Sequence, residues 1–164
     1  MLIRFEKTMK VEDVPIGAFF YLKPQGGNVI LAFMAHQKAI RPNDFEGPVV
    51  LLFPESGQFM MPRSALAYPT AVAATFPKLD VVVDSDNVEE SSTEGFSLTG
   101  GQMLLAGEDY LLCFERTDRE YGKFVNLGTG VVHLQQDPGT WLSFNPWELR
   151  VPEGETIYTF KSPE

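Results

Sequence analysis

The second half of this chain repeats the apolar pattern of its first half. Three pairs of matched positions keep their order along the sequence, although the offset between them drifts from 73 to 83 residues. The matched pairs are Val29–Phe33 with Tyr110–Phe114, Gly57 with Gly130, and Ala65–Pro69 with Glu148–Pro152. Strands hold their apolar positions while loops absorb insertions, so this pattern is typical of a duplicated β module.

The spacing of turn residues predicts an all-β fold. Helical periodicity is nearly absent, and 14 glycines and 12 prolines divide the 164 residues into short apolar or alternating runs, as in barrels and sandwiches. A module of about 70 to 80 residues is marginal alone, so the copies should pack together. We therefore expect two tandem small barrels. The alternative is a single β-sandwich or cupin-like jelly roll, in which the repeat is accidental.

The strands expected in the two halves follow one plan. The expected ranges are 2–5, 19–22, 29–35, 49–53, 59–61 and 66–68 in the first half, then 102–105, 110–115, 124–127, 131–134, 141–144 and 149–151, with 157–160 at the end. The runs 29–35 and 49–53 are apolar on both faces of the strand. Both faces should therefore be covered, and a contact between the two modules would cover them.

An acidic segment separates the two copies. Residues 80–94 contain six carboxylates and no basic residue, so burial there cannot offset the entropy of ordering. We expect a barrel over residues 1–78, an acidic linker over 79–95 and a second barrel over 96–164. The segment 70–76 could form a short helix of about two turns at most, because prolines flank it.

The formal charge of −9 is unevenly distributed. Residues 1–79 carry +2 and residues 80–164 carry −11. An acidic half repels phosphate backbones, which argues against nucleic acid as a partner, whereas a protein partner or self-association through unlike surfaces stays open. The longest apolar run, Val29–Ala35, is far shorter than a membrane span, and the N-terminus lacks the apolar region of a signal peptide. We expect a cytoplasmic protein with no membrane association.

The residue types that build metal and catalytic sites are sparse. Cys113 is the single cysteine, so it forms no intramolecular disulfide and is expected in the core. His36 and His133 are the only histidines, one in each half, too few for a histidine-based metal centre. The sequence has neither a Gly-x-Ser-x-Gly elbow nor a phosphate-binding loop. We therefore expect no catalytic residue, no metal and no cofactor.

The best candidate binding surface is aromatic. Both tryptophans lie within residues 141–147, and strand alternation places Trp141 and Phe144 on opposite faces. Exposed rings on small barrels give large contact areas at low entropic cost. The candidate binding residues are Trp141, Phe144, Trp147 and His133. The alternative is that the rings fill a barrel or the contact between the copies, with at most one indole exposed.

One motif carries a resemblance to a known family. Residues 122–130, Gly-Lys-Phe-Val-Asn-Leu-Gly-Thr-Gly, are followed some twenty residues later by Leu-Arg-Val-Pro at 149–152. Together they resemble the motif of small SH3-like barrels in phage-related and uncharacterised bacterial families. The first half resembles the same plan through residues 16–20, 29–34, 52–57 and 66–69, with one extra residue at 52–57. The resemblance implies tandem SH3-like barrels and no particular function, because this fold hosts many unrelated roles.

Two hypotheses of function remain. The first is a non-catalytic interaction or assembly module, based on the repeat, the clustered aromatics and the lack of a recognisable catalytic set. The second is an enzyme or small-ligand-binding protein with a site between the two modules, where Glu115 and Asp118 would meet His133. A concave polar pocket between the modules would favour the second hypothesis.

Overall fold

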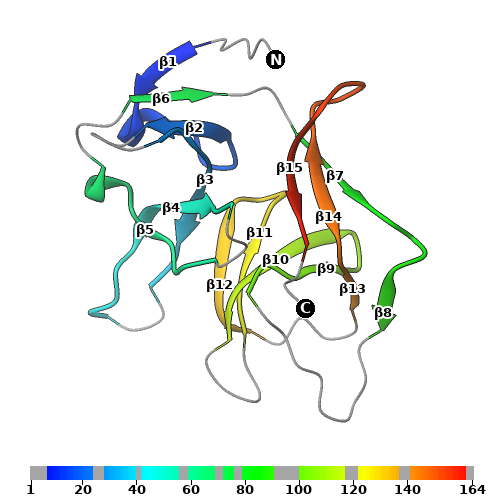
Figure 1. The fold of residues 1–164 in the computed structure, drawn as a ribbon. Helices are drawn as coiled ribbons and strands as arrows, with labels where there is room; N and C mark the ends of the chain where they lie inside the picture. The colour runs from blue at the N-terminus through cyan, green and yellow to red at the C-terminus, as the bar shows by residue number, and fades with distance from the viewer. Residues whose placement is uncertain are drawn as a thin grey trace.

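The protein is all-β, as predicted. The structure is a computed structural model that describes residues 7–23, 28–39, 42–55, 59–68, 72–75, 79–90, 100–116, 122–136 and 141–161. These residues form fifteen strands and two short 3-10 helices (Figure 1). Neither of these two helices is long enough to cross a membrane.

Six strands of the first half pair in one order. They are β1 (Lys7–Lys10), β2 (Phe19–Lys23), β3 (Ile30–Gln37), β4 (Gly47–Phe53), β5 (Arg63–Ser64) and β6 (Val72–Thr75), with the 3-10 helices η1 (Val11–Asp13) and η2 (Ala65–Ala67) between them. Strands β2 to β5 form an antiparallel meander, and β6 inserts between β1 and β2. The order across the sheet is therefore β1-β6-β2-β3-β4-β5.

Six strands of the second half pair in the same order. They are β8 (Val88–Glu90), β9 (Met103–Ala106), β10 (Asp109–Arg116), β11 (Gly122–Asn126), β12 (Val131–Gln136) and β13 (Leu142–Phe144). Strands β9 to β12 form an antiparallel meander, and β13 inserts between β8 and β9. The order β8-β13-β9-β10-β11-β12 thus repeats the first set strand for strand. We call these groups the first and second six-strand sets.

A short parallel pairing and a small sheet connect the two sets. β12 pairs with β3 where Val131 lies beside His36. Strands β7 (Asp80–Val83), β14 (Trp147–Arg150) and β15 (Thr156–Phe160) form a separate antiparallel sheet in the order β15-β14-β7. Among the described strands, β3–β12 is the one pairing between residues 1–78 and 96–164. That is the pattern expected of tandem modules rather than of a jelly roll, although no closed barrel is seen in the described residues, and tandem barrels stay a prediction.

The acidic segment expected as a linker contains two strands. β7 pairs with β14, and β8 pairs with β13 at Leu142 and Phe144. The run of three β-branched valines that ends β7 suits a strand, and Leu79 just before it is buried. Residues 80–83 and 88–90 are therefore paired strands instead of parts of an unpaired loop, because pairing and burial there offset the charge, and the division of the chain into two barrels and a linker stays a prediction. Residues 91–95 lie outside the described residues.

Three other expected elements differ from the structure. Residues 72–75 form β6 instead of part of a helix, because strands β1 and β2 satisfy their backbone on both edges. Residues 65–67 form η2, where the Ser64 hydroxyl accepts a hydrogen bond from the backbone N–H of Leu66. Residues 59–61 have no regular structure. The expected strand over 2–5 lies outside the described residues.

The apolar side chains form three clusters, one for each set and one that both sets share. In β3, Ala32 and Met34 belong to the cluster of the first set, whereas Phe33 belongs to the shared cluster. In β10, Cys113 belongs to the cluster of the second set and Phe114 to the shared cluster. Both faces of these strands are therefore covered, as the two-sided apolar run at residues 29–35 predicted for β3. The shared cluster fixes the two sets against each other, since each buried Phe or Leu contributes about 1.5–3 kcal/mol.

Candidate functional site

The three aromatic residues expected at a binding surface are buried. Trp141, Phe144 and Trp147 are 4%, 4% and 1% exposed. Trp141 packs in the cluster of the second set. Trp147 lies in the shared cluster, where it stacks on Phe160 with ring centroids 5.5 Å apart. The rings therefore fill the core, which is the alternative that the sequence left open, and neither indole is exposed.

His133 is not brought together with these aromatic residues. It lies in β12, half-buried and opposite Phe124 of β11. Strands β9, β10 and β11 separate β12 from β13, which carries Phe144. The expected partners, the Glu115 side chain and Asp118, lie outside the described residues. The arrangement of Glu115, Asp118 and His133 as one site thus stays a prediction.

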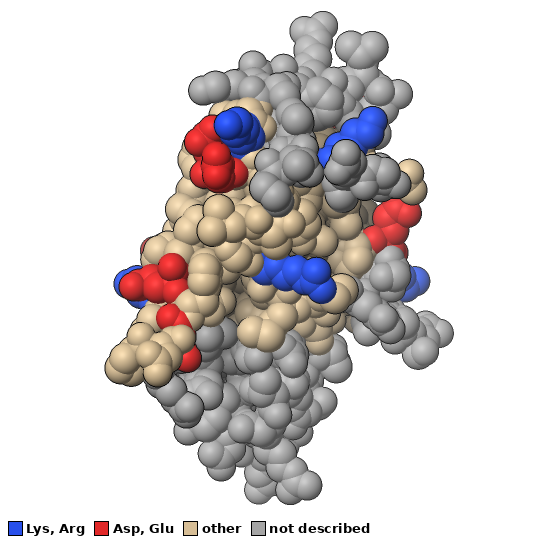
Figure 2. All heavy atoms as spheres, turned by 90° about the vertical axis from the view of Figure 1, so that its left-hand side faces the viewer, with Lys and Arg blue, Asp and Glu red and all other residues tan. Residues whose placement is uncertain are grey.

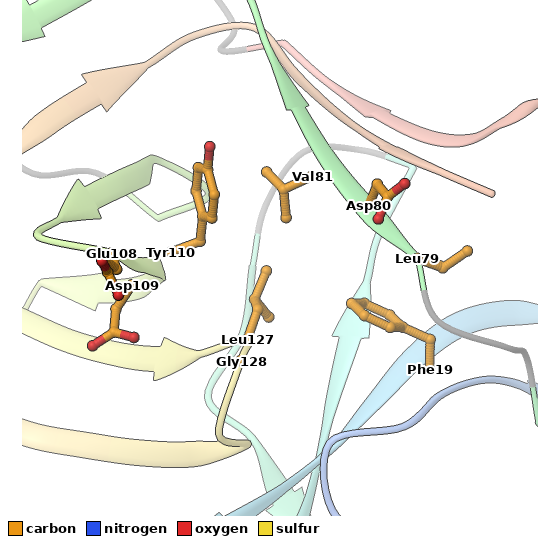
Figure 3. Close-up of a pocket in the computed structure, with 9 residues that line it drawn as sticks. All are labelled: Phe19, Leu79, Asp80, Val81, Glu108, Asp109, Tyr110, Leu127 and Gly128. Carbon is orange, nitrogen blue, oxygen red and sulfur yellow. The ribbon is translucent and has the colours of Figure 1, made fainter. Parts of the chain in front are cut away.

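A pocket of about 350 Å³ opens where the two six-strand sets meet (Figure 3). It is lined by Phe19 of β2, by Leu79, Asp80 and Val81 at the start of β7, by Glu108, Asp109 and Tyr110 at the β9–β10 turn, and by Leu127 and Gly128 after β11. We call it the junction pocket. Its residues come from both sets and from the strand that connects them, which is where the second hypothesis of function expects a site.

The junction pocket has an apolar floor and an acidic rim. The floor is formed by Phe19, Leu79 and Leu127, which are buried members of the shared cluster. The shared core therefore borders the pocket directly. Glu108 and Asp109 lie at one side of the pocket in Figure 3, and Asp80 lies at the other, with Leu127 and Val81 between them. All three carboxylates are exposed. Within the part of the chain that the structure describes, no lysine, arginine or histidine lines the pocket.

Two tight turns position the pocket residues. The β9–β10 hairpin pairs Ala106 with Asp109, and Gly107 between them adopts a φ of +65°, which favours glycine. This turn places Glu108 and Asp109 at the rim. After β11, the Asn126 side-chain oxygen accepts hydrogen bonds from the backbone N–H groups of Gly128 and Thr129, at 2.9 and 3.1 Å. The asparagine of the resemblance motif therefore organises the second wall of the pocket.

A second candidate surface is apolar and lies beside β4 and η2. Met60, Met61 and Leu66 are 64%, 44% and 68% exposed. The two methionines line a hollow of about 180 Å³ together with Val50, Leu52, Arg63 and Tyr68, and Leu66 precedes Tyr68 by two residues in the chain. We call Met60, Met61, Leu66 and this hollow the methionine patch. Figure 2 shows the side of the molecule that carries β4, β5 and η2, where uncharged surface separates the charged side chains.

Sequence reasoning missed both surfaces. The pocket residues are spread from residue 19 to residue 128, so no local motif contains them. Two local patterns in the sequence pointed to parts of the pocket. One is the turn at Gly107-Glu108, and the other is Leu79-Asp80, where an acidic residue follows an apolar one. The adjacent methionines at 60 and 61 fell in an expected strand, which hid their exposure.

The described residues contain no group of three or more histidine, cysteine, aspartate or glutamate side chains able to hold a metal ion. The comparisons with known proteins add no homologue, since no family model, curated protein or solved structure matches the chain. The function must therefore be argued from the two surfaces themselves.

Proposed function

We propose that the protein is a non-catalytic interaction module whose methionine patch binds a partner protein. The observation that carries the proposal is the exposure of Met60, Met61 and Leu66. They are three of the six large apolar side chains that are exposed among the described residues. Scattered exposed apolar residues are normal, but Met60 and Met61 are adjacent and line the same hollow, and such clustering marks an interaction surface.

The chemistry of the patch indicates what the partner presents. Methionine side chains are flexible and polarisable, so they adapt to different apolar surfaces. The hollow beside Met60 is small, which suits one apolar side chain of a partner. Arg63 lines the same hollow and is exposed, so a carboxylate next to that apolar side chain would complement it. The proposed partner is a protein segment with an apolar anchor beside an acidic residue.

Affinity capture with two matched variants tests the proposal. Met60→Glu places a charge in the patch, whereas Phe45→Glu places one on another exposed apolar residue, in the loop before β4. We expect a partner protein to be captured by the wild-type protein and by the Phe45→Glu chain but not by the Met60→Glu chain. The captured protein is then purified and titrated against all three chains. Equal affinity for the Met60→Glu and Phe45→Glu chains would overturn the proposal.

Small-ligand binding at the junction pocket is the second candidate function. The pocket itself favours it, since its volume of about 350 Å³ falls in the range of about 300–1,000 Å³ that is typical of ligand sites. An apolar floor with a few polar groups at the rim is also the usual composition of such sites. This candidate does not depend on the methionine patch.

A further inference from the structure

We infer that the junction pocket binds a small organic cation with an apolar body. This inference rests on the second candidate function and specifies its ligand. Three features support it: the sign of the charge at the rim, the composition of the floor, and the separation of the carboxylates.

The rim selects a positive charge. Asp80, Glu108 and Asp109 border the pocket, and the described residues that line it include no basic side chain. Residues 80–164 carry a formal charge of −11, so the surrounding field has the same sign as the rim. Acidic side chains over a low-dielectric floor concentrate the field and attract cations. An anionic ligand would meet repulsion from all three carboxylates.

The floor requires an apolar body on the ligand. Val81 and Tyr110 line the pocket and are only partly buried beside the shared cluster, so a ligand that covers them removes apolar surface from water. Phe19 and Tyr110 supply aromatic rings at the same pocket. A ring face attracts a cation within about 6 Å, so rings and carboxylates favour the same charge on the ligand.

The arrangement of the carboxylates favours an organic cation over a bare metal ion. Divalent cations need several oxygen ligands within about 2.0–2.6 Å of one point. Among the described residues, the rim carboxylates belong to no group of three or more that could hold a metal ion. Figure 3 shows Asp80 on the opposite side of the pocket from Glu108 and Asp109, with apolar side chains between them. An ammonium group needs only one or two of these carboxylates and leaves the floor to its apolar body.

Titration with a matched set of probes tests the inference. The probes are 2-phenylethylammonium, its neutral analogue 2-phenylethanol, the anion phenylacetate and Mg²⁺ alone. Binding is measured by calorimetry and by the amide NMR shifts of Tyr110, Leu127 and Gly128. We expect the ammonium probe to bind and to shift these amides, with the neutral analogue weaker by about threefold to tenfold and no saturable shift from phenylacetate or Mg²⁺.

Variants of the rim carboxylates test whether these groups bind the ammonium probe. Asp80→Asn and Asp109→Asn each remove one rim charge, and because both side chains are exposed the fold should survive. Glu55→Gln is the control, since Glu55 is exposed and does not line the pocket. We expect the rim variants together to weaken the ammonium probe by about tenfold and Glu55→Gln to leave it unchanged. Urea unfolding of each variant checks that its stability is preserved.

The outcomes distinguish failure of the cation inference from failure of small-ligand binding at the junction pocket. Equal binding of 2-phenylethanol and the ammonium probe, tighter binding of phenylacetate or Mg²⁺, or no effect of the rim variants would overturn the cation inference and leave ligand binding standing. If no probe shifts the pocket amides at millimolar concentration, both the inference and the second candidate function fail. The methionine patch proposal is unaffected in either case.

Discussion

The indole N–H of Trp147 donates a hydrogen bond of 2.7 Å to the carbonyl oxygen of Gly101, and both residues are buried. Trp147 begins β14 and Gly101 precedes β9, so this bond ties the small sheet to the second six-strand set. The same indole meets Phe53 of the first set edge-on, with centroids 6.4 Å apart. Trp147, which belongs to the small sheet, therefore contacts both six-strand sets at the shared core.

Replacing Trp147 tests this role. Trp147→Phe keeps an aromatic ring but leaves the buried Gly101 carbonyl without its donor, so we expect a loss of about 1–3 kcal/mol in the free energy of unfolding. Trp147→Ala also opens a cavity and should cost about 3–5 kcal/mol. Urea unfolding measures both values. A Trp147→Phe chain as stable as the wild type would show that the hydrogen bond contributes nothing net.

Glycine at position 101 is required by the packing around it. A Cβ there would overlap the Phe160 ring, and the φ of Gly101 is +93°. Gly101→Ala should therefore force the ring to move and destabilise the fold by more than about 2 kcal/mol. Gly107→Ala is the matched control, because its φ is also positive but nothing lies within 4 Å of its Cβ position. It should cost only about 1 kcal/mol, and equal losses in thermal melts would contradict the packing argument.

Asn126 should stabilise the turn that forms one wall of the junction pocket. Its side-chain oxygen accepts two backbone hydrogen bonds, and the residue is buried. Asn126→Ala leaves both N–H groups without this acceptor and should cost about 1–3 kcal/mol. Asn126→Asp retains an acceptor oxygen and should cost less. Chemical denaturation ranks the two variants, and the reverse order would show that the side-chain amide has another role.

The sequence predicted the strands that alternate or run apolar over their whole length. β3, β4, β10 and β12 were found at the expected positions because their side chains are buried on one or both faces. β6 was missed because its alanines favour a helix locally, and only pairing with strands far along the chain makes it a strand. β7 was missed because residues 80–94 were assessed together by their net charge. The three valines of β7 within that segment are half-buried and pair as a strand.

The duplication stays a prediction, although the first pair of matched segments lies in strands that hold equivalent places. Val29–Phe33 and Tyr110–Phe114 correspond to β3 and β10, which hold the same place in the two pairing orders. Ala65–Pro69 and Glu148–Pro152 do not correspond, because η2 lies within the first set whereas β14 lies outside the second. The second set also begins at β8, inside the expected linker. The junction pocket depends on contacts between both sets, so the sequence alone could not locate it.

The stability of the fold should fall between about pH 10 and pH 12 because of Tyr158. Its hydroxyl donates a hydrogen bond of 2.9 Å to the Pro54 carbonyl oxygen, which links β15 to the end of β4. Burial raises the pKa of Tyr158 from 10.0 to about 12. The native state therefore holds this proton more tightly than the unfolded state, so the stabilisation is complete below about pH 10 and is lost as pH rises through about 12.

Tyr158→Phe provides the comparison for this pH dependence. The variant lacks the titrating hydroxyl, so its free energy of unfolding should decline less than that of the wild type between pH 10 and pH 12. Some decline should persist, because burial also raises the pKa of Tyr21. Urea unfolding at half-unit steps from pH 8 to pH 12 measures both curves. Parallel curves would show that the Tyr158 hydroxyl titrates alike in the folded and unfolded chains, and its contact with Pro54 would then contribute nothing to the alkaline limit of stability.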